Sequence, residues 1–270
     1  MTASVSADAV RRWRLTVRWE RLLLPAAGIG MTLLVWHWWS QSRGADSVIA
    51  AFSPVRTLHS IWDLLATGAL LPHMLVSVKR VAVGLAIGLA VGTPLGVLLG
   101  TQVWLERATS PVLQLVRMIS PLSWMPIAIM VFGIGDAPVY FLLGVAALFP
   151  IMLNTRSGIA LIERKWILAV RSLGASRWQL LRTVYLPAIL MHLLTGFRLA
   201  VGICWIVLVP AEMLGVNAGL GYYILDARDR LAYSEMMAVI VVIGVLGYCF
   251  DLFARWLVAR WTPHVHQQAG

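Results

Sequence analysis

The sequence predicts an all-α integral membrane protein with six transmembrane helices. The 270-residue chain is 60% apolar and only 13% charged, about half the charged share of a soluble domain. It contains six predominantly apolar runs close to the length that crosses a bilayer. The charges between these runs alternate in the way that membrane topology requires. Together these observations exclude a disordered chain and argue against a soluble enzyme.

The apolar runs predict where the chain crosses the membrane. A span needs about 20 predominantly apolar residues, and the runs are Leu22–Ser40, Val81–Gln102, Ser120–Ile134, Val139–Leu161, Pro187–Leu214 and Met236–Trp256. The third is short and contains two prolines, which is typical of a broken helix that lines a cavity. The first follows a basic N-terminus, residues 1–21, and ends in the aromatic run Trp36–Trp39. This pattern indicates a retained span and not a cleaved signal peptide.

The connecting stretches predict the topology. Counted from Lys, Arg, Asp and Glu, the net charge is +3 before the first span, +1 over 102–119, +4 over 163–186 and +1 over 251–270. It is 0 over 42–71, −1 over 133–138 and −2 over 212–235. The positive-inside rule therefore places both termini in the cytoplasm. The cytoplasmic stretches absorb most of the net charge of +10, so nucleic-acid binding is not needed to explain it.

Two residue patterns predict how the helices pack. Val55, Leu58, Ile61, Trp62 and Leu65 form an apolar stripe at helical spacing, which predicts a helix along the external membrane surface. The second span carries a glycine ladder, defined as Gly84, Gly88, Gly92, Gly96 and Gly100. Small residues at this spacing let another helix approach closely, either within the chain or in a homodimer. The two cysteines, Cys204 and Cys249, lie in apolar runs and are predicted to be small core residues.

The stretch 163–186 is too long to serve only as a connection between two spans. Its pattern predicts a helix up to Leu173, an end at Gly174, and a second amphipathic helix capped by Ser176. Two interpretations fit such a projection into the cytoplasm. It docks on a soluble partner, or it lies on the surface of anionic lipid.

The order of motifs around this stretch resembles the permeases of bacterial ABC importers. Nine residues separate Gly174 from Val184-Tyr-Leu-Pro187, and this spacing is similar to the cytoplasmic signature Glu-Ala-Ala, three residues, Gly, nine residues, Ile-x-Leu-Pro. Further segments are similar to the nitrate/sulfonate/taurine/bicarbonate branch of that family: Ser77–Arg80, Ser120–Pro126, Phe149–Ile151, Thr195–Ala200, Ala211–Leu214 and Gly219–Tyr222. The resemblance covers about residues 75–262. Leu168 stands where the signature usually has Glu, so the electrostatic part of the partner contact is altered.

The resemblance implies the type I ABC-importer (MetI-like) permease architecture. Residues 22–74 would hold the first transmembrane helix and the external amphipathic helix, 75–262 a core of five transmembrane helices with the coupling region 163–186, and 263–270 a cytoplasmic tail. The permease would act as a homodimer in the bacterial inner membrane. Its partners would be membrane lipid, two cytoplasmic ABC ATPase subunits and a periplasmic or lipid-anchored substrate-binding protein.

The resemblance also implies what the chain binds. ATP and Mg²⁺ would bind to the partner ATPases and no cofactor to this chain, whose sequence has no Gly-x-x-x-x-Gly-Lys-Ser/Thr loop. The substrate would be a small oxyanion of the nitrate, sulfonate/taurine, cyanate or bicarbonate type. The residues expected to couple to the ATPase are Leu168, Ala169, Gly174, Ala175 and Trp178.

The expected substrate pathway comprises Arg198, Glu212, Trp124 and Asn154. A cation inside a span is costly and marks a functional candidate, and Arg198 lies about 16 Å along the helix from Pro187. It either attracts the anion or has a structural role, in which it pairs with Glu212 or with backbone carbonyls at a broken helix. Glu212, at the end of the fifth span, would repel anions and is expected to be a gate or a packing residue.

Other functions make different demands on the sequence. A secondary transporter driven by an ion gradient should carry intramembrane carboxylates and an inverted repeat. A membrane-embedded enzyme should carry His or Asp clusters at the interface, whereas the six histidines here are scattered and no metal or catalytic motif is present. A related branch that imports vitamin precursors is an alternative substrate class.

Overall fold

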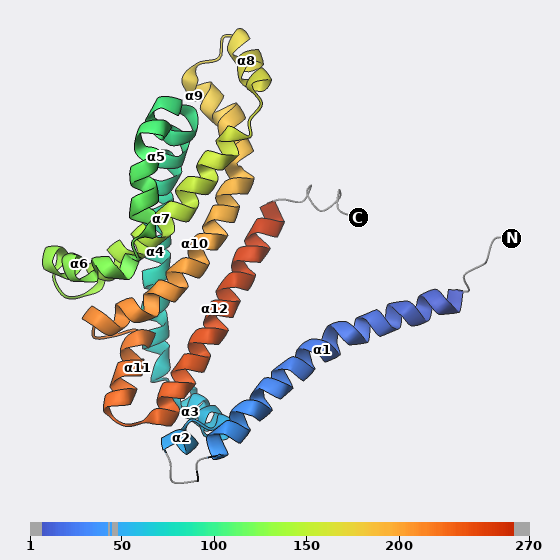
Figure 1. Cartoon of the computed structure of the whole chain (residues 1–270), viewed down its shortest axis with the longest axis vertical. Helices are drawn as coiled ribbons and strands as arrows, with labels where there is room; N and C mark the ends of the chain where they lie inside the picture. The colour runs from blue at the N-terminus through green and yellow to red at the C-terminus, as the bar shows by residue number, and fades with distance from the viewer. Residues whose placement is uncertain (1–6, 43, 45–47, 262–270) are drawn as a thin grey trace.

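The computed structural model describes residues 7–42, 44 and 48–261, with side chains from residue 23 onward except at 164 and 177. Figure 1 shows a bundle of helices in this part of the chain. The helices are α1 (Ala7–Gln41), α2 (Val48–Ala51), α3 (Pro54–Ala66), α4 (Leu70–Thr101), α5 (Val103–Met118), η1 (Pro121–Trp124), α6 (Met125–Phe132), α7 (Asp136–Ala160), α8 (Arg164–Ser172), α9 (Arg177–Leu180), η2 (Leu181–Tyr185), α10 (Leu186–Gly215), α11 (Leu220–Asp229) and α12 (Tyr233–Trp261). The side chains of the basic segment 1–21, and the whole tail 263–270, lie outside the described part.

Four helices in the described part are long and apolar enough to cross a membrane: α4, α7, the continuous helix Trp178–Gly215, and α12. They confirm the second, fourth, fifth and sixth predicted spans. α5 and the η1–α6 segment would together make a fifth span, bent by 88° at the break between them. The first predicted span, Leu22–Ser40, lies within α1, which runs away from the bundle in Figure 1 and stays a predicted span.

The third predicted span, Ser120–Ile134, is wrong in its extent. The sequence suggests a loop over 102–119, whereas the structure forms the 16-residue helix α5 there. Charged residues on α5 interrupt its hydropathy, although its apolar residues remain on one face. Ser120 takes an extended conformation, with a φ of −58° and a ψ of 132°. The following Pro121 disfavours a helical residue at that point, so the predicted break is confirmed.

α4 and α7 pack against each other along the glycine ladder. A Cβ atom added at any of its five glycines would crowd or clash with α7. At Gly92, for example, it would lie 2.9 Å from the carbonyl oxygen of Leu148. The ladder therefore serves packing within the chain, which is the first of the two roles that the sequence allows.

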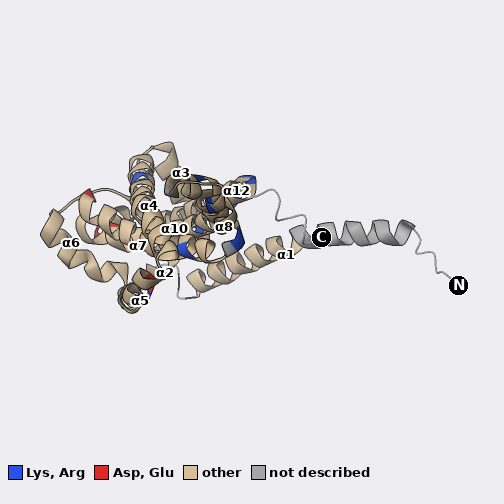
Figure 2. Cartoon of the chain, turned by 90° about the horizontal axis from the view of Figure 1, so that it is seen from above, with Lys and Arg blue, Asp and Glu red and all other residues tan. Residues whose placement is uncertain are grey.

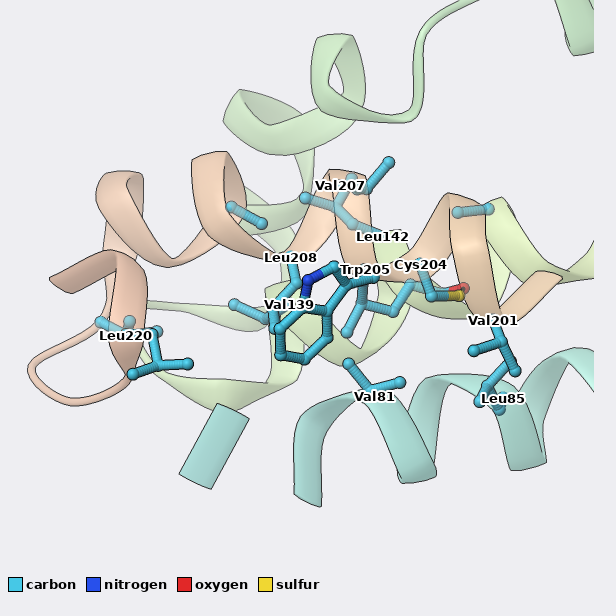
Figure 3. Packing of buried hydrophobic residues seen from close by; sticks show 14 of the residues in the cluster. Val81, Leu85, Val139, Leu142, Val201, Cys204, Trp205, Val207, Leu208 and Leu220 are labelled. Atoms are coloured by element: carbon cyan, nitrogen blue, oxygen red, sulfur yellow. Dashed lines mark hydrogen bonds between the residues drawn. The ribbon is translucent and has the colours of Figure 1, made fainter. Parts of the chain in front are cut away.

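α10 covers another side of α7 and completes the core (Figure 3). Leu142 of α7 and Cys204 and Leu208 of α10 are fully buried, which confirms the prediction for Cys204; Cys249, by contrast, is exposed. The Trp205 indole nitrogen donates a hydrogen bond of 3.1 Å to the carbonyl oxygen of Ile243. This contact ties α12 to the bundle.

The predicted external helix is α3. Ser53 caps its N-terminus by accepting a hydrogen bond from the Arg56 amide, and a proline occupies its first position. The apolar side chains of Val55, Leu58 and Trp62 stay exposed. These three side chains are open to lipid, as expected of a helix that lies on a membrane surface, whereas Ile61 of the same stripe packs against the core.

Candidate functional site

α8 and α9 project from one end of the bundle, beyond α7 and α10 (Figure 1). This end is called the α8 end below, and the opposite end, which bears α11, is called the α11 end. Figure 2, seen from above, shows a bundle that is mostly uncharged, with several of its basic segments near α8 and α12. The two ends of the bundle differ in their exposed and buried residues, and the predicted site residues are distributed between these ends and the middle of the bundle.

The turn between α8 and α9 forms as the sequence predicts. Gly174 has a φ of +78°, a conformation that side chains rarely adopt, and its amide bonds to the carbonyl oxygen of Arg171. The Ser176 amide donates to the Gln179 side chain at 2.7 Å, and the Gln179 amide donates to the Ser176 hydroxyl at 3.3 Å. These reciprocal bonds make a capping box. The direction of α8 relative to α10 is thus determined by local interactions.

The second predicted helix of this region forms, but it is not a separate helix. α9 is a single turn that passes through the π-helical turn η2 directly into α10. Pro187 explains the wide turn, because it lacks an amide hydrogen and its ring crowds the carbonyl of Thr183, four residues before it. The projection is therefore one helix, α8, followed by an extension of α10.

The predicted coupling residues lie on the outside of this projection. Leu168 and Trp178 are 54% and 58% exposed, Ala169 and Gly174 are exposed, and Ala175 is half-buried. The neighbouring Trp166 and Leu173 are also exposed apolar residues, Leu173 at 84%. Large apolar side chains gathered at the tip of a projection are typical of a surface that contacts another protein.

A cavity of about 610 Å³ lies at the base of α8. It is lined by the end of α7, by Trp166 and Val170 of α8, and by Val184 and His192 beyond the turn. Since the cavity separates α8 from the start of α10, α8 is held to the bundle mainly through its two ends. A helix held in this way can move as a lever with whatever binds its exposed face.

The α11 end contains a buried cluster of charges. Glu212, at the end of α10, is fully buried, and Arg80 of α4 is 2% exposed. Arg80 Nη1 lies 2.7 Å from Glu212 Oε1, and the Ser77 hydroxyl donates to the same carboxylate at 2.8 Å. The amide of Gly221 completes its set of donors at 2.9 Å. The Arg80 guanidinium and the Glu212 carboxylate are thus paired with each other, and the carboxylate accepts further hydrogen bonds, as a buried ion requires.

The same arginine reaches a second carboxylate and the loop before α11. Arg80 Nη2 lies 2.5 Å from Asp136 Oδ1, at the first residue of α7, and Arg80 Nη1 donates to the carbonyl oxygen of Ala218 at 2.6 Å. Gly219 has a φ of +117°, and a Cβ there would clash with the Glu212 carboxylate. The glycine lets the loop close over the ions. One guanidinium therefore joins α4, α7, α10 and this loop.

These contacts revise the expected role of Glu212. Glu212 is fully buried in this conformation, which favours packing over gating, the two roles expected of it. The expected alternative pairing of Arg198 with Glu212 is wrong. Fourteen residues of helix separate the two by about 21 Å at the usual rise.

Arg198 pairs instead with a carboxylate of α12. Its Nε lies 3.3 Å from Asp251 Oδ1, and Arg255 holds the other oxygen of that carboxylate at 2.7 Å. Arg198 is 42% exposed on its side chain. The pair links α10 to α12, so the structural interpretation of Arg198 is the one that the geometry favours.

The other two candidates lie near the middle of the bundle. Asn154 lines a cavity of about 370 Å³ between the end of α5, α7 and α10, and its amide donates to the carbonyl oxygen of Pro150 at 2.8 Å. Trp124, in η1, is half-buried and packs against the hydrophobic core. Only Asn154 of the four expected pathway residues therefore contributes a polar group to this cavity.

Sequence reasoning missed three residues of these sites. Arg80 stands out as a cation without an assigned role near the same membrane face as Glu212, and its spacing of three from Ser77 puts both on one helix face. The opposite charges of Arg80 and Glu212, and their position near the same membrane face, were the signal from which the buried cluster could have been predicted. Asp136 of the buried cluster and Arg117, which lines the same cavity as Asn154, gave a weaker signal. Each of them falls in a stretch that hydropathy assigns to a loop.

The described residues contain no group of three or more His, Cys, Asp or Glu side chains placed to hold a metal ion. The features of this part of the chain described above are a projecting amphipathic helix, a buried ion cluster and cavities between helices.

Comparison with known proteins gives concordant results. The sequence profile described as "binding-protein-dependent transport system inner membrane component" matches residues 92–263. A bicarbonate transport system permease protein of Synechococcus elongatus is 32% identical over 94% of this chain and 93% of its own length. A putative aliphatic sulfonates transport permease protein of Escherichia coli is 35% identical over 96% of this chain and 97% of its own. A nitrate import permease protein of Synechocystis is 29% identical over 90% of each.

The fold has a relative among solved structures. A chain of the MetNI methionine ABC transporter in an inward-facing conformation matches with a TM-score of 0.57 and 20% sequence identity. The match covers 76% of this chain and 96% of that chain. At this identity the likeness extends to the fold alone, and it agrees with the predicted type I importer permease architecture.

Proposed function

Because the chain belongs to the family of binding-protein-dependent transport system inner membrane components, we propose that it is the permease subunit of an ATP-driven importer of a small oxyanion. The observation that carries this proposal is the α8–α9 projection. Its rigid turn at Gly174 and its exposed apolar tip suit a helix that docks on a separate ATPase. ATP and Mg²⁺ bind to that ATPase, and this chain forms the pathway.

Two copies of the chain make up the transporter in this proposal. The cavities near the middle of the bundle lie beside α5, which buries none of its own residues. Val112, Leu115 and Met118 leave an apolar face of this helix exposed. A second copy packed there would enclose the cavities, which a single chain leaves open, and lipid would cover the remaining apolar surface.

The two ends of the bundle then face different compartments. The stretch 163–186 at the α8 end carries a net charge of +4, whereas 212–235 at the α11 end carries −2. The positive-inside rule supports an α8 end, and both termini, in the cytoplasm of a bacterial inner-membrane protein. The binding protein docks at the α11 end, where α11 and the loops on either side of it are presented.

The substrate class comes from the relatives. They are described as permeases for bicarbonate, aliphatic sulfonates, nitrate and taurine, which share a small size and an oxyanion group. ATP closes the ATPases, α8 moves with them, and the continuous helix Trp178–Gly215 carries the motion into the bundle. The binding protein selects the substrate, and the permease admits it.

The test is transport by the complete complex. The chain is purified with its partner ATPase and binding protein, reconstituted in proteoliposomes, and assayed for ATP-dependent uptake of labelled nitrate, bicarbonate and taurine. Uptake of at least one is expected. Uptake driven by an ion gradient without ATP would favour a secondary transporter. Uptake of a vitamin precursor alone would move the chain to that substrate class.

A matched pair of variants tests the docking role of α8. No atom lies within 4 Å of a Cβ built at Gly174, so substitution there does not disturb the bundle by collision. Gly174→Asp and Gly174→Asn have the same shape, and both side chains tolerate a positive φ better than others do. We expect the Asp variant to remain in the membrane but lose ATP-driven uptake, because it puts a charge in the apolar dock. The Asn variant retains more uptake. Normal uptake by Gly174→Asp would contradict the docking role.

A further inference from the structure

The arginines within the bundle are not equivalent. Arg80 is bound by Glu212 and Asp136, Arg198 by Asp251, and Arg156 by Glu106. Arg117, near the end of α5, forms none of the ion pairs found among the described residues and is exposed in the single chain. If α5 and the η1–α6 segment form one span, Arg117 is an ionisable residue within a span and without a carboxylate partner, which marks it as a functional-site candidate.

Arg117 lies where two cavities meet. One, of about 140 Å³, lies between α4, α5 and α7 and is also lined by Glu106, Gln114 and Arg156. The other, of about 370 Å³, is also lined by Asn154. Both share Arg117, Phe149 and Leu153. The concave surface that they form runs along α7, with Arg117 at its middle.

The position of Arg117 in its own helix supports a role in the pathway. It lies two residues before the break at Ile119, where the α5 and η1–α6 segments turn by 88°. Helices that break inside a membrane are tolerated where they line a cavity, and in transporters such breaks mark the binding site.

The charges around the two cavities favour an anion. Their lining contains one carboxylate, Glu106, and two guanidinium groups, Arg117 and Arg156. Glu106 is bound to Arg156, which leaves one positive charge on Arg117. Gln114 and Asn154 add side-chain amides, which can donate to an oxyanion.

We propose that Arg117 is the central residue of an oxyanion subsite in the transport pathway, with Gln114 and Asn154 as neighbouring donors. A guanidinium presents two parallel N–H groups that match nitrate, carboxylate or sulfonate oxygens. One solvated cation binds such an anion weakly, so the ion is attracted and then released, as conduction requires. This inference rests on the proposed function and assigns its substrate contact to Arg117 in place of Arg198.

The test compares Arg117→Gln with Arg107→Gln in the reconstituted complex. Arg107 lies on the same helix and is exposed, but it lines neither cavity. We expect Arg117→Gln to lower uptake of labelled nitrate, bicarbonate or taurine at least tenfold. Assembly and ATP hydrolysis stimulated by the binding protein should be preserved, a combination that a purely structural role does not produce. Arg107→Gln should transport like the parent chain, and Arg117→Lys should retain more uptake than the Gln variant.

A charge-restoration experiment makes the test independent of folding. In an Arg117→Cys, Cys249→Ser chain, the remaining Cys204 is buried, so a thiol reagent modifies position 117 alone. Attachment of a trimethylammonium-ethyl group should restore uptake, and attachment of the sulfonate-bearing ethyl group of the same length should not. Equal uptake after both reagents would overturn the proposal.

The outcomes separate this inference from the function on which it rests. Parent-level uptake by Arg117→Gln, while the parent chain transports the anions, would exclude the subsite and leave the proposed function intact. Failure of the parent chain to take up any of the three anions would remove the oxyanion class, and the subsite with it. Loss of uptake in Arg198→Gln but not in Arg117→Gln would return the role to Arg198.

Discussion

At the scale of single residues, the strongest interactions in the described chain lie at the α11 end. Arg80 and Glu212 are both almost fully buried, and the Ser77 hydroxyl and the Gly221 amide satisfy the remaining oxygens of the carboxylate. A buried ion pair adds little net stability compared with apolar residues, because both ions lose their hydration. Loss of one partner is costly, since it leaves the other charge buried and unpaired.

Arg80→Gln should therefore destabilise the protein strongly. Removal of the guanidinium leaves Glu212 without its counter-ion, and the expected loss is about 3–5 kcal/mol of unfolding free energy. Unfolding of the purified protein in detergent measures it. The matched control is Arg228→Gln, whose partner Asp229 is exposed, with an expected change below about 1 kcal/mol. Equal effects of the two variants would mean that the buried cluster does not hold the α11 end together.

At the scale of helices, the contact between α4 and α7 is the most extensive in the described part of the bundle. The glycine ladder presents backbone instead of side chains to α7, and opposite it stand residues such as Leu143, Ala147 and Ile159. Dispersion contacts and backbone proximity, not burial from water, stabilise such a pair inside a membrane. The ladder therefore packs α4 and α7 into one unit, against which α8 can move.

Gly88→Ala tests this unit. The added methyl group would collide with Ala147, so the helices must separate, and overpacking of this kind costs about 1–3 kcal/mol. Gly202→Ala in α10 is the control, since nothing lies within 4 Å of the position and alanine favours a helix over glycine by about 0.5–1 kcal/mol. Thermal unfolding in detergent should shift down for the first variant and not for the second. A downward shift of equal size in both variants would mean that the collision with Ala147 is not the cause of the destabilisation.

At the scale of the whole molecule, the two ends have opposite properties. The α11 end is locked by buried ions that join three spans and a loop. The α8 end carries an amphipathic helix with exposed apolar side chains above a cavity of about 610 Å³. Motion imposed on the α8 end would therefore be carried by the long helices toward a stiff opposite end, and the cavities near Arg117 lie between the two.

The orientation of these ends is testable by labelling. Ser172→Cys at the end of α8 and Asp229→Cys at the end of α11 are compared in a Cys249→Ser background, where the buried Cys204 stays unreactive. A membrane-impermeant maleimide should label Asp229→Cys in intact spheroplasts and Ser172→Cys only in inverted vesicles. Labelling of both from the same side would refute the proposed topology.

Features that depend on local chemistry could be predicted from the order of residues alone. Four spans, the broken fifth, the capped turn at Gly174 and Ser176, and the glycine ladder could all be predicted. Each follows from hydrophobic length, helix-capping preference or residue size within one segment. The same is true of the family resemblance, which rests on motifs in order along the chain.

The pairing of charges, in contrast, depends on how the helices pack in three dimensions. Arg80 finds Glu212 across 132 residues, and Arg198 finds Asp251 across 53. Such partners depend on which helices are neighbours and at what depth each side chain lies, and neither is encoded within a single segment. The same holds for α5, whose charges suggested a loop until its packing beside α7 placed Arg117 against the cavities. Local pattern defines a helix, but the ion pairs of a membrane protein are selected by the long-range packing that brings their helices together.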